Sequence, residues 1–90
     1  MVNIVIKKLD LEESAKKKFD LIGNFIGYKP KIIKGSIRSI DKTNITYIEP
    51  HRIIYKNITF LFFNFTNEVY IENLENKIRI NEIESYLKKC

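Results

Sequence analysis

The segment from Ile58 to Phe65 constrains the fold of this chain more than any other. It reads Ile-Thr-Phe-Leu-Phe-Phe-Asn-Phe, so apolar side chains occupy both faces of an extended backbone. Aromatic and β-branched residues favour strands, and a strand that is apolar on both faces is typical of the centre of a sheet covered on both sides. The segment is too short to cross a bilayer. The sequence therefore predicts a β-rich domain with this strand in its core.

An amphipathic helix is predicted before the strands, over residues 10–22. Four apolar residues share one face of this helix: Leu11, Ala15, Phe19 and Ile22. Asp10 is the expected N-cap, and Glu13 completes a pattern like a capping box. Gly23 is the expected end of the helix. One apolar face implies that the helix packs on the strands.

From Lys31 to Ile80 the hydrophobic period changes to that of strands. Two sets of residues alternate in the first strand: Ile33, Gly35 and Ile37 against Lys34, Ser36 and Arg38. This pattern predicts one buried side and one basic side. Residues 41–44 are an expected turn into a second strand at 45–48, which Pro50 and His51 should end, with His51 in a loop. Further strands are expected near 53–55, 69–71 and 77–80.

Ninety residues suffice for one core, so a single domain over 1–90 is expected. The fold class is mostly β (α+β), with residues 1–9 as a strand or arm, 31–80 as strands and 81–90 as a short helix. Its expected architecture is a small antiparallel barrel of the Sm or SH3 type with about five strands, because a barrel leaves no sheet edge exposed.

The residues that support catalysis and metal binding are scarce. There is one histidine, His51, and one cysteine, Cys90, and the two lie far apart in the sequence. A structural zinc site needs four converging ligands, and a nucleophile needs a base and an orienting group. We therefore expect no catalytic residue, no metal, no cofactor and no small-molecule substrate. The N-terminus lacks the long apolar region of a signal peptide, which predicts a cytoplasmic protein without a membrane anchor.

Positive charge is concentrated in the first half of the chain. Residues 1–45 carry ten Lys or Arg against five Asp or Glu, whereas residues 46–90 carry six of each. Such asymmetry favours a polyanion, and RNA is the expected partner. The predicted nucleic-acid-binding residues are Lys29, Lys31, Lys34, Arg38 and Lys42 for phosphates, with Tyr28, Tyr47 and also Tyr55 for stacking on bases. The alternative is that the charge is compositional and the tyrosines border the core.

A second function class fits the same sequence. A protein-interaction module, or an inhibitor encoded by a virus or plasmid that binds a host protein, is also small and needs no catalytic residue. The two classes differ in the surface they require. A basic patch continuous with tyrosines favours RNA, whereas an exposed apolar patch favours a protein partner.

Part of the chain, from about residue 12 to 80, resembles the Sm-like protein subunit of archaeal and eukaryotic ribonuclease P. The likeness lies in Phe19-Asp20-Leu21-Ile22-Gly23, in the strand and turn from Gly35 to Ile45 with Asn44 in its Asn position, and in the strands from Arg52 to Ile71. Residues 25–33 are shorter than the family's first strands and loop, and Ile80-Asn81-Glu82-Ile83 replaces its Arg-Pro motif. The resemblance implies an Sm-like fold and a non-enzymatic role as a ribonucleoprotein subunit.

Overall fold

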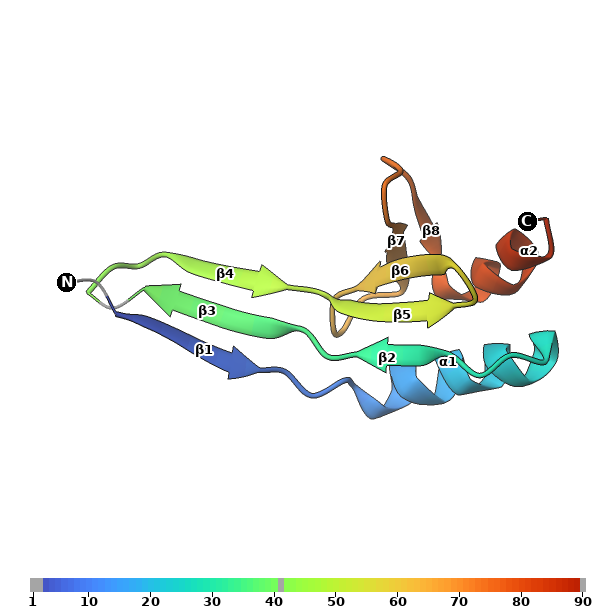
Figure 1. The fold of residues 1–90 in the computed structure, drawn as a ribbon, viewed down its shortest axis with the longest axis horizontal. Helices are drawn as coiled ribbons and strands as arrows, with labels where there is room; N and C mark the ends of the chain where they lie inside the picture. Colours follow the sequence, from blue (N-terminus) through green and yellow to red (C-terminus); the bar gives the residue numbers. More distant parts are fainter. Residues whose placement is uncertain (1–2, 41, 90) are drawn as a thin grey trace.

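The computed structural model describes residues 3–40 and 42–89. Within these residues the chain forms eight strands, two α-helices and one 3-10 helix, so the mostly β fold is confirmed (Figure 1). In chain order the elements are β1 (Ile4–Lys8), α1 (Glu13–Ile26), β2 (Lys31–Ile33), β3 (Ser36–Ile40), β4 (Thr46–Glu49), β5 (His51–Tyr55), β6 (Ile58–Phe62), β7 (Glu68–Ile71), β8 (Lys77–Arg79), η1 (Ile80–Glu82) and α2 (Ile83–Lys88).

The strands form two antiparallel sheets. Strands β1-β3-β4 make a three-stranded sheet, called here the wing, and β2-β5-β6-β7-β8 make a five-stranded sheet that forms the body together with the helices. Ile33 lies opposite Arg52 and Ser36 lies opposite Glu49, so one register runs through both sheets. Residues 31–55 are therefore one long two-stranded ribbon. β1 flanks its outer half and β6 flanks its inner half (Figure 1).

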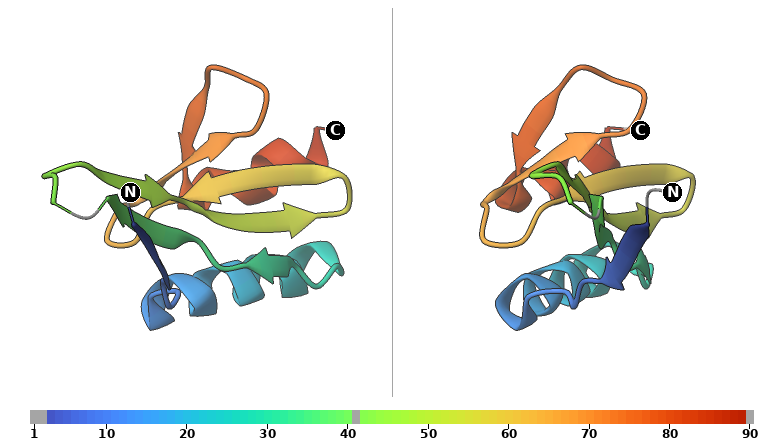
Figure 2. Two further views of the ribbon diagram at one scale, coloured as in Figure 1. Left: turned by 60° about the vertical axis from the view of Figure 1, so that its left-hand side comes forward. Right: turned by 90° about the vertical axis from the view of Figure 1, so that its left-hand side faces the viewer.

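The hydrophobic core lies in the body, between the five-stranded sheet and the helices. Its fully buried side chains include Phe19 of α1, Ile53, Phe60 and Phe62 of the sheet, and Ile83 of α2. The rings of Phe19 and Phe62 meet edge to face with centroids 5.2 Å apart, a preferred aromatic geometry. The hairpin of β7 and β8 projects away from α1 (Figure 2).

The helix α1 buries the face that the sequence predicts but has different ends. Ala15, Phe19 and Ile22 are buried as expected. The predicted cap is wrong, because the helix begins at Glu13 and the Asp10 carboxylate instead forms an ion pair with Lys34, 3.1 Å from its Nζ. The predicted end at Gly23 is also wrong. The helix continues to Ile26 and ends at Gly27, whose φ of 72° is the left-handed conformation that glycine adopts without strain.

Within the described residues the two sheets remain open, so the predicted barrel is not confirmed. Only the inner half of the ribbon enters the five-stranded sheet, because β5 is the one ribbon strand that β6 pairs with, whereas beyond Gly35 and Pro50 the ribbon pairs with β1 along its other edge. The principal extents are 49 × 26 × 21 Å, and the long one follows the ribbon. The wing therefore extends past the end of the body instead of closing onto it.

The predictions for the strand residues are confirmed in β6 and are partly wrong in the ribbon. Phe60 and Phe62 are fully buried, as the apolar run predicts. The prediction that Ile33 lies on a buried side is wrong, because its side chain is 42% exposed while Ser36 is buried. The expected loop at His51 is also wrong, because this residue begins β5. The closing helix packs Ile83 inward as predicted.

Candidate interaction surface

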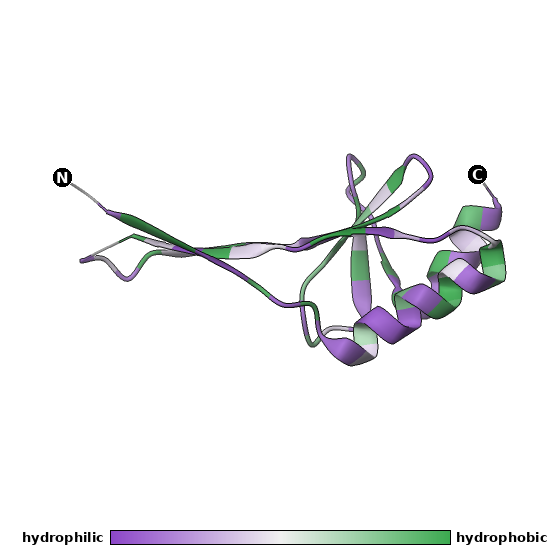
Figure 3. Cartoon of the chain, turned by 60° about the horizontal axis from the view of Figure 1, so that its bottom comes forward, coloured by the Kyte–Doolittle hydropathy of each residue, from purple (hydrophilic) through white to green (hydrophobic). Residues whose placement is uncertain are grey.

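One face of the wing is apolar and uncovered. Side chains alternate across a strand, so the register places Ile4 beside Ile40, and Ile6 beside Arg38 and Tyr47, on the same face. Their exposed fractions include 61% for Ile4, 61% for Ile6 and 56% for Tyr47. This surface is called here the isoleucine face; its apolar members are Ile4, Ile6, Ile40, Ile45 and Tyr47. Apolar segments run along the wing in Figure 3, and neither helix lies against them.

The opposite face of the wing carries fewer apolar side chains but is equally exposed to solvent. Val5 and Ile48 are more than half exposed, and Ile37 lies between them at the centre of the sheet. Lys7 lies beside Ile37 on this face. All residues of β1 and all residues of β4 are exposed. Three strands with apolar side chains on both faces therefore project into solvent.

The whole molecule has more surface than a compact chain of its mass. A folded monomer of 10.7 kDa is expected to expose about 5,500 Å², whereas this chain exposes 6853 Å². Its radius of gyration is 14.8 Å, against about 12 Å expected for 90 residues. The surplus of about 1,300 Å² exceeds the ~800 Å² that each partner contributes to a standard protein interface.

The wing joins the body through a buried polar junction at the bend of the ribbon. His51 is 1% exposed, and its Nδ1 accepts a hydrogen bond of 3.0 Å from the Gly35 N–H. Its Nε2 therefore carries the proton and donates to Asn64 Oδ1 at 3.1 Å. Asn64 also accepts from the Glu12 N–H and donates to the Asp10 carbonyl. One side-chain pair thus ties the ribbon to the segment before α1 and the loop after β6.

Two features make this junction sensitive to substitution and to acid. A Cβ added at Gly35 would lie 2.1 Å from the Glu49 carbonyl oxygen, so the two strands of the ribbon approach closely only with glycine there. The pKa of His51 is lowered, first because burial disfavours the charged ring and also because of the Lys34 ammonium, although the Asn64 hydrogen bond opposes the shift. Protonation at Nδ1 would also remove the acceptor for the Gly35 N–H.

The predicted phosphate-binding residues are distributed along the ribbon and over both of its faces. Lys31 lies on the face opposite the core, whereas Lys34 and Arg38 share the other face by alternation. Both of these are already in ion pairs, Lys34 with Asp10 and Arg38 with Glu49 at 2.8 Å. Lys29 precedes β2, and Lys42 lies in the turn between β3 and β4, so these two are at opposite ends of the ribbon.

The three predicted tyrosines lie in different environments. Tyr47 is exposed on the isoleucine face opposite Arg38, and Tyr28, 40% exposed, lies beyond the C-terminal end of α1. The predicted role of Tyr55 in stacking is wrong, because its ring is fully buried and its hydroxyl donates to the Phe19 carbonyl at 2.7 Å. Burial raises the pKa of this hydroxyl. The tyrosines therefore do not form one stacking surface.

Sequence reasoning missed a row of residues that crosses the uncovered face of the five-stranded sheet. The register aligns them across all five strands: Ile33, Arg52, Leu61, Tyr70 and Lys77. Tyr70 is 44% exposed, and the ring of Phe63 meets it edge to face. Arg52 is exposed and has no ion pair within 3–40 and 42–89. This row is called here the open face; only the pairing of the strands, which the sequence alone does not give, could have revealed it.

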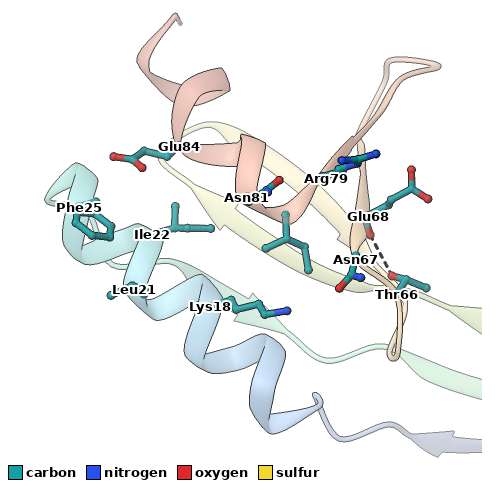
Figure 4. Close-up of a pocket in the computed structure, with 11 residues that line it drawn as sticks. Lys18, Leu21, Ile22, Phe25, Thr66, Asn67, Glu68, Arg79, Asn81 and Glu84 are labelled. Atoms are coloured by element: carbon teal, nitrogen blue, oxygen red, sulfur yellow. Dashed lines mark hydrogen bonds between the residues drawn. The ribbon is translucent and has the colours of Figure 1, made fainter.

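A groove of about 920 Å³ separates α1 from the β7–β8 hairpin and η1 (Figure 4). Leu21, Ile22 and Phe25 line it from α1, with Leu21 and Phe25 more than half exposed. Its polar lining mixes both signs of charge: Lys18, Arg79, Glu68 and Glu84. The groove contains no histidine, cysteine or hydroxyl next to a base, so it offers apolar contact without a catalytic arrangement.

The described part of the chain lacks both a cluster of metal ligands and a helix that could span a membrane. No group of three or more His, Cys, Asp or Glu residues there is arranged to hold a metal ion. Neither α1, with 14 residues, nor the shorter α2 is long and apolar enough to cross a membrane.

Comparisons with protein-family models, with curated proteins and with solved structures found no match for this chain. The resemblance to the ribonuclease P subunit rests on the sequence motifs described above.

Proposed function

We propose that this chain is a small non-enzymatic interaction module that binds a protein through the isoleucine face of its wing. The observation that carries the proposal is an apolar sheet face, with Ile4, Ile6 and Tyr47 all more than half exposed, to which no helix of the body is applied. Monomers rarely leave a contiguous apolar patch of this kind without a partner.

Two further observations support a protein over a polyanion at this surface. Two cations on this face of the ribbon, Lys34 and Arg38, each have a carboxylate within 3.1 Å, so little unpaired positive charge remains there apart from Lys8 at the inner end of β1. The surplus surface is of the size that protein interfaces bury. An exposed apolar patch favours a protein partner and a basic patch with tyrosines favours RNA, and on the wing the apolar patch is the larger of the two.

Photocrosslinking tests this proposal with a matched pair of positions. A photoreactive phenylalanine derivative would replace Tyr47 on the isoleucine face or, as a control, Tyr70 on the open face; both tyrosines are exposed to a similar extent, 56% and 44%. In a cell extract, we expect position 47 to form a discrete protein adduct that survives nuclease treatment. An adduct at position 47 that nuclease removes, or none at all, would contradict the proposal.

RNA binding is the second candidate, and the open face favours it. Arg52 and Tyr70 lie on that face on either side of Leu61, and Lys31 lies on the same face near its edge. Cations and exposed aromatic rings on an uncovered sheet are the elements that bind single-stranded nucleic acid. In this proposal the chain is a component of a ribonucleoprotein, as the resemblance to the ribonuclease P subunit implies, and it acts in the cytoplasm.

Salt dependence tests the RNA candidate. The logarithm of the affinity for a single-stranded RNA should fall with the logarithm of salt by about 0.7 per neutralised phosphate. Replacing Lys31 and Arg52 together by Ala should reduce that slope by roughly one to two units. The double variant of Lys34 and Arg38 serves as the comparison, because both are engaged in ion pairs. Absence of salt-dependent binding by the wild type at ~50 mM salt would exclude this candidate.

A further inference from the structure

The outer part of the isoleucine face has the charge balance that a surface needs to pack against itself. The chain has a net charge of +5, so two copies repel one another over most of their surface. On this face Arg38 is neutralised by Glu49 at 2.8 Å and lies between Ile6 and Tyr47. The other cations of the wing lie at its margins or on its other face: Lys8 at the inner end of the isoleucine face, beside Ser36, Lys7 on the opposite face, and Lys42 in the turn at the outer end. The part of the face from Arg38 outward to Ile4 is therefore nearly neutral.

The surface that the whole chain exposes is also large enough for a dimer contact. The molecule exposes about 1,300 Å² more than expected for its mass, and a standard interface takes about 800 Å² from each partner. The surplus on one copy is enough for one such interface. Two three-stranded sheets with the same right-handed twist pack face to face when their strands cross at about −30°, with side chains interdigitating. A second copy supplies a sheet of matching twist and width.

We propose that the isoleucine face is the contact of a two-fold symmetric homodimer, in which the wings of two copies pack into a small β-sandwich. A two-fold contact uses the same patch on both subunits, so Tyr47 and Ile6 of one copy meet the same face of the other. The Arg38–Glu49 pair lies at the contact, where the two carboxylates and two guanidinium groups alternate in sign. This inference rests on the proposed function and names its partner as a second copy.

Light scattering coupled to gel filtration, with sedimentation velocity across a concentration series, tests the dimer. We expect the wild type to have a mass of about twice 10.7 kDa at micromolar concentration. Tyr47→Glu should raise the dissociation constant at least a hundredfold, because it places a charge at the centre of an apolar contact. Glu at this position lies opposite Arg38, so the folded monomer keeps a favourable cross-strand pair.

Two further variants keep the result interpretable. Ile6→Glu also lies opposite Arg38, on the other side of it, and should dissociate the dimer independently. Ile48→Glu, one residue from Tyr47 but on the opposite face, is the matched control and should change the dissociation constant less than about threefold. Circular dichroism and amide exchange of β6 confirm for each variant that the body is folded.

Three results would overturn the inference. The first is a wild type that stays monomeric at concentrations up to ~1 mM. The second is dissociation by Ile48→Glu but not by Tyr47→Glu, which would place the contact on the opposite face. The third is a dimer that persists in both Tyr47→Glu and Ile6→Glu. A monomeric wild type that still forms a nuclease-resistant adduct with another protein at position 47 refutes the dimer and leaves the proposed function intact.

Discussion

Phe60 in the body and Ile6 in the wing both lie in the middle of a β-strand, yet Phe60 is fully buried and Ile6 is 61% exposed. Both strands are rich in β-branched or aromatic residues, and both strands are paired. The difference is the layer above them: the helices cover one face of the five-stranded sheet, and no described element covers the wing. A strand pattern therefore reports that a residue prefers a pleated surface, whereas burial depends on which element packs against that surface.

The largest effect on stability should come from truncating a side chain of α1 that packs on the five-stranded sheet. Phe19→Ala should lower the free energy of unfolding by roughly 3–5 kcal/mol, because it leaves a cavity against Phe62. Lys17→Ala, exposed on the same helix, should change it by less than about 0.5 kcal/mol. Urea denaturation measures both. Equal effects from the two variants would show that α1 does not cover the core with this face.

A smaller effect is expected at the boundary between the two regions. Gly35→Ala should destabilise the ribbon by roughly 1–3 kcal/mol, because its Cβ would overlap the Glu49 carbonyl. Amide exchange should accelerate in β3 and β4 while β6 stays protected, since the wing opens without the body. Gly27→Asn is the control, because its surroundings are open and Asn tolerates the left-handed backbone. Uniform acceleration in both sheets would mean that they unfold as one unit.

Acid tests the same boundary through His51. Its pKa is lowered on folding, so the unfolded chain binds the proton more readily, and stability should fall as the pH drops below the ordinary value of about 6.5. For one proton the loss is at most about 1.4 kcal/mol per pH unit. His51→Asn, which retains an acceptor for the Gly35 N–H, should lack this slope. Urea midpoints between pH 5 and 7 measure it.

The smallest effect should come from the wing's surface charge. Arg38→Ala removes an ion pair between two side chains that are each about half exposed, so the monomer should lose only about 0.2–1 kcal/mol. The loss should shrink as salt increases, since exposed pairs are screened. Chemical denaturation at low and high salt, with Lys88→Ala as a second exposed pair for comparison, checks it. A salt-independent loss above that range would mean that Arg38 contributes through packing.

Local patterns in the sequence predicted the body better than the wing. The helix face with Ala15 and Phe19 and the buried pair Phe60 and Phe62 follow from spacing alone, because one element buries them against another. The N-terminal end of α1 was missed because Asp10 forms an ion pair with Lys34, 24 residues away, instead of capping the helix. Contacts at such separations leave no local trace in a sequence.

The candidate site shows the same limit more strongly. The sequence shows the basic residues from Lys29 to Lys42 but not the direction of their side chains. Side chains alternate along the ribbon, so these residues are divided between its two faces. Ile4 and Ile6 look like ordinary strand residues, and nothing in their neighbours indicates that the sheet they join extends beyond the helices. His51 likewise gives no sign of its partners Gly35 and Asn64, which are 16 and 13 residues away.

The unbroken register of the ribbon has a consequence for how this chain can change. Because strand pairing continues from β2–β5 into β3–β4, two residues added to each strand near the turn at 42–44 would lengthen the wing and leave every residue of the body in place. An insertion of a single residue in one strand would instead exchange the two faces beyond it. The length of the wing can therefore change without a change in the core. Descendants of this sequence can lengthen or shorten the wing by two residues per strand at a time while keeping the same body.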